Sequence, residues 1–327
     1  MGEQFQQLDL QDIAQLVKRN NLLAIKEYVG SMRDCIAVLS DKEHQCSGIV
    51  TINISLPTII VPDLHARPEF ILKVLEYTVW QKNILTLLQE QKVNLIFLGD
   101  LVHSEDISFW VHELPGGRIA LKQGDELLLE MIHELTTLKI LCDIKSAFPG
   151  HVHILRGNHD DVRGRIAGFY VKGMIPQSHM VLEWLEVNFG REFIDLVMEF
   201  EDCLPLIAEG GSFVTSHSAP GRILHKTEVQ NKESDVAKML TWTENREEFG
   251  GLDETELKRN ICETWRNLGK TGKPLWVAGH RTVEEPMLYR EQAGGIFVQI
   301  NNPSAFIIGI IPANKMFDTE KHIHRLE

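Results

Sequence analysis

Cysteine is sparse in this sequence, and no Cys-x-x-Cys pair occurs. The five cysteines are scattered along the chain, so neither a disulfide framework nor a zinc ribbon is indicated. This pattern predicts reduced thiols and a cytoplasmic location. No apolar run approaches the length that crosses a membrane. The first seven residues also lack a basic stretch followed by an apolar core, so we expect a soluble chain that is not exported.

A net positive charge is also absent. The formal charge of −13 at pH 7 argues against general binding to nucleic-acid duplexes or anionic membranes, since both need a basic face. A phosphate-bearing substrate would then need local cations, and bound metal ions are the simplest source. Internal repeats and low-complexity linkers are lacking too. With 43% hydrophobic and 24% charged residues, the chain is predicted to be globular, with enough apolar residues for one large core or two ordinary ones.

Short β-prone runs alternate with helical patterns along the chain. Residues 8–39 have apolar side chains at helical spacing, which predicts an N-terminal helical extension (residues 1–47) before a main domain (residues 48–327). In that domain we expect strands within residues 49–61 and at 93–98, 151–155, 212–216 and 274–278, and helices at 70–89 and 126–147. Helical insertions are expected at about residues 164–201 and 226–268. A final hairpin is expected at residues 295–311, with Asn301-Asn302-Pro303 as its turn.

Five of the predicted strands end in residues that can bind a metal ion. These residues are Asp63 with His65, Asp100, Asn158 with His159, His217 and His280. Open α/β sheets place their sites at the carboxyl ends of strands, so we expect these side chains to meet. Carboxylate, carboxamide and imidazole donors together suit borderline divalent ions such as Mn, Fe or Zn.

The spacing of residues within these segments predicts which side chains can bind the same ion. Asp63 and His65, at positions i and i+2, share one face of an extended segment and can grip one ion together. Asn158 and His159 are adjacent and point to opposite faces, so one can bind a metal while the other faces a substrate.

The same residues carry a family resemblance. The motifs Asp63-Leu64-His65, Gly99-Asp100-Leu101-Val102, Gly157-Asn158-His159-Asp160, the lone His217 and Gly279-His280 resemble the five ordered motifs of the calcineurin-like metallophosphoesterases. Segments around them, such as Leu155-Arg156-Gly157-Asn158-His159 and Cys203-Leu204-Pro205-Leu206, are similar to the phosphoprotein phosphatase (serine/threonine phosphatase) branch. The resemblance runs from about residue 58 to residue 310. It implies an α/β fold with two mixed β-sheets packed as a sandwich and flanked by helices, a four-layer αββα arrangement with helical insertions.

The resemblance also implies a dinuclear metal site in a catalytic domain. Asp63 and His65 would hold the first ion, Asp100 would bridge both ions, and the second ion would be held by Asn158, His217 and His280. Two such ions lower the pKa of a shared water and neutralise the phosphoryl group during attack by the bridging hydroxide. His159 would act as general acid toward the leaving oxygen. The implied activity is hydrolysis of a phosphate monoester, either a phosphoprotein or a small phosphate ester.

One departure from the phosphoprotein phosphatase pattern leaves the substrate open. His103 and Ser104 stand where that branch has an Asp that orients the catalytic His and an Arg that binds phosphate. A His at the 103 position is familiar among superfamily members that act on diesters and small molecules. A phosphodiesterase or nucleotide phosphohydrolase therefore stays an alternative, and a catalytically inactive phosphate-binding scaffold is a further one.

A second departure concerns the first ion. The wider group has a second His two residues after the last motif His, and this chain has Thr282 there. The first ion is therefore expected to have three protein ligands completed by water. We expect substrate contacts from Arg222, Arg281 and His103, with Arg163 and Arg165 as further candidates. The carboxylates of Glu105 and Asp161 are either solvated loop charges or, for one of them, a group that orients His159.

Overall fold

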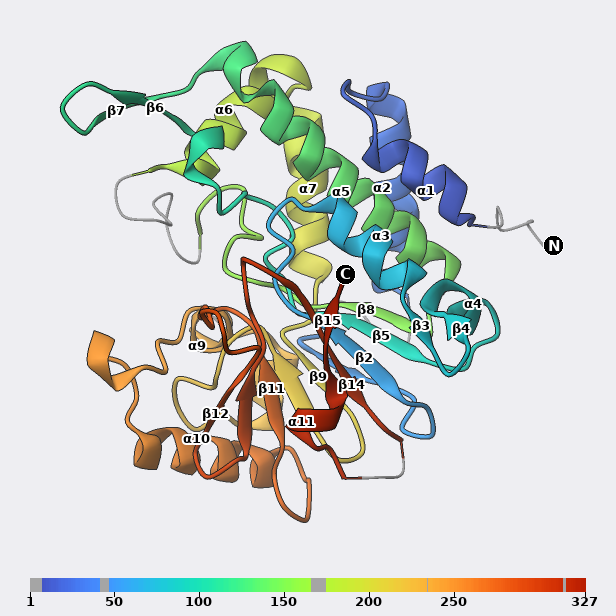
Figure 1. Cartoon of the computed structure of the whole chain (residues 1–327), viewed down its shortest axis with the longest axis vertical. Coiled ribbons are helices and arrows are strands. Elements are labelled where there is room, and N and C mark those ends of the chain that lie inside the picture. The colour runs from blue at the N-terminus through green and yellow to red at the C-terminus, as the bar shows by residue number, and fades with distance from the viewer. Residues whose placement is uncertain (1–7, 42–46, 166–174, 234, 314–315) are drawn as a thin grey trace.

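Two β-sheets packed face to face form the centre of the computed structural model, and helices cover both outer faces (Figure 1). The structure describes residues 8–41, 47–165, 175–233, 235–313 and 316–327. It confirms the predicted α/β sandwich with four layers.

The first sheet has five strands in the order β15-β14-β2-β5-β8. Three of them are parallel: β2 (Thr58–Val61), β5 (Asn94–Phe97) and β8 (Val152–Ile154). The strand β14 (Phe306–Ile311) pairs antiparallel with β2 and with β15 (Ile323–Leu326). The carboxyl ends of the three parallel strands therefore meet at one edge, where their loops carry the first three motifs.

The second sheet has six strands in the order β1-β9-β10-β11-β13-β12. They are β1 (Ile49–Thr51), β9 (Ile207–Glu209), β10 (Val214–Ser216), β11 (Trp276–Ala278), β13 (Phe297–Gln299) and β12 (Arg290–Gln292). The strands β10, β11 and β13 are parallel to one another, while β9 and β12 run against their neighbours β10 and β13. The motif residues His217 and His280 follow β10 and β11.

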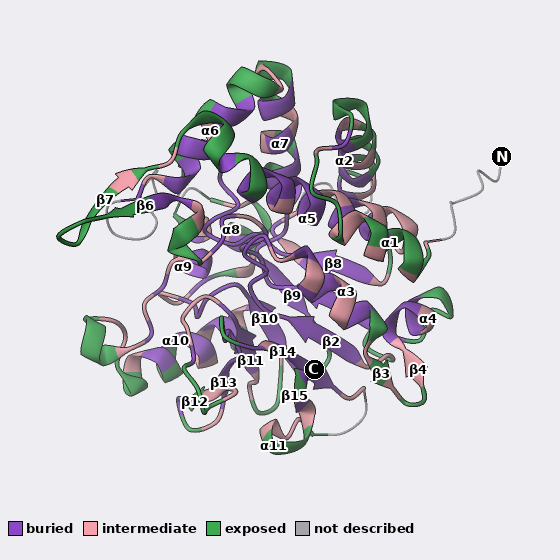
Figure 2. Ribbon diagram, turned by 45° about the horizontal axis from the view of Figure 1, so that its top comes forward, coloured by how far each residue is buried: buried purple, intermediate pink, exposed green. Residues whose placement is uncertain are grey.

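Alternation along the strands explains the layers. In β2, Ile59 and Val61 pack in the cluster that includes the N-terminal helices, while Ile60 packs in the cluster between the two sheets. In the same way, Trp276 and Ala278 of β11 face the C-terminal helices, and Val277 faces the opposite sheet. Successive side chains of a strand point to opposite faces, so each strand contributes to two apolar layers. These uninterrupted apolar runs are typical of strands buried on both sides, as the buried centre of Figure 2 shows.

Seven helices from the first two thirds of the chain cover the five-stranded sheet. They are α1 (Leu10–Val17), α2 (Ile25–Leu39), α3 (Pro68–Glu76), α4 (Ile84–Gln89), α5 (Leu128–Ala147), α6 (Gln177–Asn188) and α7 (Arg191–Cys203). The six-stranded sheet is covered by α8 (Lys226–Gln230), α9 (Val236–Thr241) and α10 (Glu254–Asn267). A short helix, α11 (Thr319–His322), precedes β15.

Both predicted insertions contain helices among their described residues. The first contains α6 and α7, while its residues 166–174 lie outside the described residues, and the second contains α8 to α10. The predicted N-terminal extension packs into the same apolar cluster as α5 and α7. No helix among the described residues has the length and apolar character to span a membrane. Cys35, Cys142 and Cys262 are free thiols.

The prediction of one long helix over residues 70–89 is wrong. After α3 the chain makes a two-stranded ribbon of β3 (Thr78–Val79) and β4 (Lys82–Asn83) before α4 begins. Trp80 and Gln81 have φ of +50° and +68°, which a right-handed helix does not allow. The side chain of Asn83 then accepts a hydrogen bond from Thr86 N (2.8 Å) and caps α4.

The predicted hairpin over residues 295–311 is also wrong. The strands β13 and β14 belong to different sheets, so Asn301 and Asn302 carry the chain from one sheet to the other. Both side chains are buried and hydrogen-bonded, unlike those of an exposed turn. The hairpin that the structure contains joins β12 and β13 through Ala293-Gly294-Gly295, where all three φ are positive. A further unpredicted hairpin, β6 (Val111–Leu114) with β7 (Arg118–Leu121), projects from the molecule (Figure 1).

Candidate metal centre

Four polar residues in the loops that follow β2, β5 and β11 adopt a left-handed backbone conformation. The φ angles are +48° at His65, +48° at Asp100, +64° at His103 and +66° at His280. This region costs about 1–3 kcal/mol for a residue other than glycine and persists only where the surroundings enforce it. Its concentration at four chemically capable side chains marks these loops as a candidate functional site.

Glycines allow the motif loops to touch through their backbones. A Cβ on Gly157 would lie 2.2 Å from both N and Oδ1 of Asp100, and a Cβ on Gly279 would lie 2.1 Å from Oδ1 of Asp63. Real side chains do not approach so closely, so only glycine permits these contacts. The loop after β8 is thereby pressed against the loop after β5, and the loop after β11 against that after β2.

His65 is a predicted ligand of the first ion. Its Nδ1 lies 2.9 Å from the carbonyl oxygen of His103, so Nδ1 carries the hydrogen and Nε2 presents its lone pair. Around Nε2 lie Asp63 Oδ2 at 3.7 Å and Asp100 Oδ2 at 3.8 Å. A ring nitrogen that faces two carboxylates is well placed to bind a metal cation together with them.

His217 shows the same arrangement at the predicted second ion. Its Nδ1 lies 3.1 Å from Leu98 O, so Nε2 is the ring nitrogen that faces the other predicted ligands. That Nε2 faces Asn158 Oδ1 at 2.9 Å, Asp100 Oδ2 at 3.2 Å and His280 Nδ1 at 3.2 Å. The imidazole is completely buried, and Nε2 of His280 is buried without a hydrogen-bond partner. Imidazole, carboxamide and carboxylate groups that converge in this way can hold a metal ion.

The electrostatics of the site point the same way. Burial lowers the pKa of His217, but Asp100 and Asp63 outweigh it and raise the pKa to about 9. Burial likewise lowers the pKa of His65, but Asp63, Glu105 and Asp100 raise it by more, so the pKa lies above its usual value. The carboxylates thus demand positive charge, which either protons on the imidazoles or bound metal ions can supply.

Two triads of ligand atoms are close enough to share an ion. One contains His65, Asp100 and His159, and the other contains Asp100, His217 and His280, with all ligand atoms of a triad within 4.8 Å of one another. Asp100 belongs to both triads, the arrangement expected of a bridging ligand. Nδ1 of His217 lies 3.8 Å from Asp63 Oδ1. The structure therefore brings together the six predicted metal ligands and His159.

Two residues without a predicted role fix the ligands. The carboxylate of Asp160 accepts hydrogen bonds from the backbone N–H groups of Asp100 (2.9 Å), Leu101 (2.8 Å) and Gly157 (2.7 Å). Asn301 donates to Asp63 Oδ2 at 2.7 Å. The position of Asp160 beside His159 could have signalled its role, whereas Asn301 was hidden in a predicted turn.

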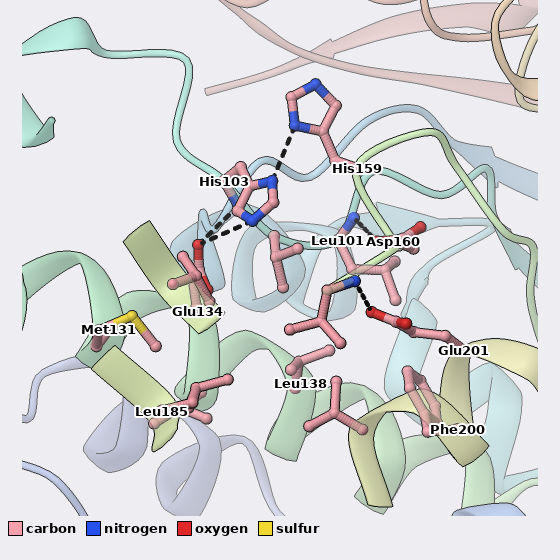
Figure 3. A pocket seen from close by; sticks show the side chains of 15 residues that line it. Leu101, His103, Met131, Glu134, Leu138, His159, Asp160, Leu185, Phe200 and Glu201 are labelled. Atoms are coloured by element: carbon pink, nitrogen blue, oxygen red, sulfur yellow. Dashed lines mark hydrogen bonds and ion pairs between the residues drawn. The ribbon is translucent and has the colours of Figure 1, made fainter. Parts of the chain in front are cut away.

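His103 lies beneath His159. Its side chain is 1% exposed, and its Nδ1 lies 3.2 Å from Nδ1 of His159. The backbone N–H of His103 donates to Glu134 Oε1 at 3.0 Å, and its Nε2 lies 3.9 Å from the same oxygen. Figure 3 shows His103 between His159 and Glu134. The side chain thus lies between two buried partners, and its predicted contact with substrate stays a prediction.

Two acidic residues of α5 hold the loop that carries His103. Glu130 accepts from Ser104 N at 2.7 Å, and Glu134 is four residues later on the same helix face. Burial raises the pKa of Glu130 to about 7, and burial together with Glu130 raises that of Glu134. Two glutamates four residues apart in an apolar helical pattern could have signalled this support in the sequence. A cavity of about 30 Å³, lined mostly by apolar side chains, lies behind His103 and His159 (Figure 3).

The predicted phosphate-binding arginines are arranged differently from one another. Arg281 directly follows the predicted ligand His280, and its Nε lies 3.2 Å from Glu244 Oε2. Arg222 is held by Glu228 and Asp235. Arg163 pairs with Asp195. Arg165 pairs with Asp161 and Asp202. Of these four, Arg281 is the one that we find beside a predicted metal ligand.

The two extra carboxylates have separate surroundings. Asp161 lies 3.6 Å from Nη2 of Arg156 and 3.3 Å from Nε of Arg165. Glu105 lies beside His65, with Oε1 3.6 Å from Nε2. His159, which one of them was expected to orient, instead contacts His103.

Comparisons with known proteins bear on the family and the fold of the chain. The family model described as calcineurin-like phosphoesterase matches residues 56–309. A probable serine/threonine-protein phosphatase of Encephalitozoon cuniculi (strain GB-M1) is 28% identical over 181 residues, which are 51% of this chain and 37% of that protein. The match thus spans little more than a third of the relative. A solved serine/threonine phosphatase from Saccharomyces cerevisiae, described as similar to human phosphatase PP5, has a TM-score of 0.60 at 12% identity and covers 98% of this chain and 96% of its own. The latter likeness concerns the fold.

Proposed function

Because this chain belongs to the calcineurin-like phosphoesterase family and is therefore a phosphoric ester hydrolase, we propose that it uses two divalent ions to hydrolyse phosphate monoesters. The observation that carries the proposal is the shared position of Asp100 in two triads of ligand atoms. The donor set of carboxylates, imidazoles and one carboxamide suits Mn, Fe or Zn.

Each ligand has a defined part in this proposal. Asp63, His65 and Asp100 would hold the first ion, while the second would be held by Asp100, Asn158, His217 and His280. The ions, when bound, would provide an activated water and neutralise the charge of the phosphoryl group. The outer hydrogen bonds from His65 to His103 O and from His217 to Leu98 O would keep each ring in its ligating tautomer.

His159 would donate a proton to the leaving oxygen. A hydrogen bond between its Nδ1 and His103 would orient the ring and leave Nε2 toward the ligand cluster, 3.8 Å from Asp100 Oδ2. Burial and the neighbouring histidines lower the pKa of His159, although Asp100 opposes them. An anionic phosphate ester would favour the protonated imidazole, because a nearby negative charge stabilises the cation. Arg281 is the side chain proposed to contact the phosphate.

The substrate is proposed to be a phosphomonoester, from either a phosphoprotein or a small molecule. The similarity to a probable serine/threonine-protein phosphatase supports this class. A phosphodiester or nucleotide is the second candidate, favoured by the contact of His103 with His159 and by Ser104 at the position of the phosphate-binding Arg.

The two substrate classes can be compared directly. Purified protein with added Mn²⁺ would be assayed on p-nitrophenyl phosphate and on bis-p-nitrophenyl phosphate, with Asp100→Asn as the inactive reference. We expect preferential turnover of the monoester and two bound ions per wild-type chain. Turnover of the diester alone would replace the monoesterase proposal. If the wild type neither took up metal nor turned over either substrate, the result would favour the inactive phosphate-binding scaffold.

A further inference from the structure

Three carboxylate oxygens surround Nε2 of His65 at nearly equal distances. Glu105 Oε1 lies at 3.6 Å, Asp63 Oδ2 at 3.7 Å and Asp100 Oδ2 at 3.8 Å. Asp63 and Asp100 are predicted ligands of the first ion. Glu105 has no ligand role in the family resemblance, yet its oxygen is the nearest of the three.

Each separation from Nε2 is longer than a hydrogen bond and lies within the span of two ligands of one ion. All three exceed the usual N–H···O range of about 2.7–3.2 Å. Metal–nitrogen and metal–oxygen bonds of about 2.0–2.2 Å place two ligand atoms of one ion about 3–4 Å apart, depending on the angle between them. Since Nδ1 of His65 is engaged with His103 O, Nε2 is the ring nitrogen that faces all three oxygens.

The loop that carries Glu105 is held on several sides. The backbone N–H groups of His103 and Ser104 donate to Glu134 and Glu130 of α5. The carbonyl oxygen of Ser104 accepts from Trp110 Nε1 at 2.9 Å and from Gln177 Nε2 at 3.2 Å. Buried partners therefore fix the two residues before Glu105 and direct its side chain, which is 19% exposed, toward the site.

We propose that Glu105 is a fourth protein ligand of the first ion, in place of the second histidine that Thr282 replaces in the last motif. This inference rests on the proposed dinuclear function. Three carboxylates and one imidazole would surround the first ion, whereas the second has more nitrogen donors. Carboxylate oxygens suit Mn²⁺, so the first site should prefer Mn²⁺ more strongly than the second does.

Arg67 provides the competing explanation for Glu105, because the two side chains attract each other electrostatically. However, Arg67 donates through Nε, Nη1 and Nη2 to the backbone oxygens of Leu64, Pro303 and Asp63. It therefore acts as a brace of the loop after β2. If Glu105 served only this arginine, its neutralisation would leave metal binding unchanged.

The test is a Mn²⁺ titration of the metal-stripped full chain, with free Mn²⁺ measured by electron paramagnetic resonance. Wild type would be compared with Glu105→Gln, and with Asp106→Asn as the control. Asp106 is exposed one residue away, and an Asn retains the oxygen that caps Ser108 N. His65→Ala and His280→Ala would identify which binding step belongs to which ion. Circular dichroism of each metal-free variant would confirm an unchanged fold.

We expect two Mn²⁺ in the wild type and in Asp106→Asn. Glu105→Gln should weaken one step about tenfold or more, because even an outer-shell partner costs about 10- to 100-fold in metal affinity. The weakened step should be the one that His65→Ala removes and His280→Ala retains. If Glu105→Gln bound Mn²⁺ in two steps with the affinities of the wild type, the Glu105 inference would be overturned and the dinuclear proposal would stand. A wild-type chain that binds no Mn²⁺ would overturn both.

Discussion

His103 and His159 face each other through their Nδ1 atoms, 3.2 Å apart and shielded from solvent. Burial lowers the pKa of His103 to about 3, so this imidazole is neutral at physiological pH. The phosphoprotein phosphatase pattern that this chain resembles has an aspartate at the 103 position. Here a neutral ring orients the proposed general acid through a hydrogen bond and adds no negative charge beside it.

Replacing His159 tests its proposed role directly. His159→Ala should lower turnover by roughly the 10²- to 10⁴-fold typical of a lost general acid, while metal content stays near that of wild type. Steady-state kinetics and elemental analysis of the same preparation measure both quantities. His159 also lies in a triad with His65 and Asp100. Loss of one ion in the variant would therefore make His159 a ligand.

Replacing His103 separates orientation from substrate contact. His103→Ala should lower kcat by about 10- to 100-fold, as when the outer partner of a site residue is removed. KM and metal content should change little, because the side chain lies beneath His159. His112→Ala, on the exposed β6–β7 hairpin, is the matched control and should behave as wild type. A higher KM at constant kcat would instead indicate substrate contact.

The contact between Gly157 and Asp100 can be tested by adding one methyl group. In Gly157→Ala the new Cβ would overlap the backbone nitrogen of Asp100. We expect destabilisation by about 1–3 kcal/mol or more, as in overpacked cores, together with weaker metal binding. Gly150→Ala is the control, since nothing lies within 4 Å of its added Cβ. Equal urea midpoints for both variants would contradict the overlap.

Glu201 should make stability depend on pH. Burial raises its pKa from 4.5 to about 8, against the opposing effect of Arg156. Between pH 4.5 and 8 the folded chain keeps a proton that the unfolded chain has released, so this group lowers stability as pH rises through the window. Below the window Glu201 has no such effect, and above it the full destabilisation persists.

Glu201→Gln should remove this dependence. The thermal midpoint of the variant relative to wild type should therefore increase from pH 5 to pH 9. Glu199→Gln, at an exposed position of α7, should follow the wild-type profile. Parallel profiles for wild type and Glu201→Gln would mean that the folded protein ionises Glu201 without cost.

The sequence predicted what depends on local order. Dense β-branched runs that end in Asp63, Asp100 and Asn158 indicated strands with polar residues at their carboxyl ends, and the family motifs assigned their roles. Residues that act across the fold were missed, because their importance arises from contacts between distant segments. Asn301 resembled a turn residue until β13 and β14 proved to lie in different sheets.

The same limit applies to the helices and loops. The helical spacing of residues 70–89 gave no sign that Trp80 and Gln81 reverse the chain. Glu130 and Glu134 lay in a correctly expected helix, but only the packing of α5 against the loop after β5 shows what they hold. Local periodicity can thus indicate an element, while its partners follow from tertiary packing.

The predicted ligands are divided between the two sheets. Asp63, Asp100 and Asn158 follow strands of the five-stranded sheet, and His217 and His280 follow strands of the six-stranded sheet. Neither sheet alone carries the complete proposed set, so bound metal would link the halves of the sandwich as a cross-link does. Any ion that binds only the folded state adds to its stability by mass action. The concentration of available metal would then affect the stability of the folded state as well as the rate of the reaction.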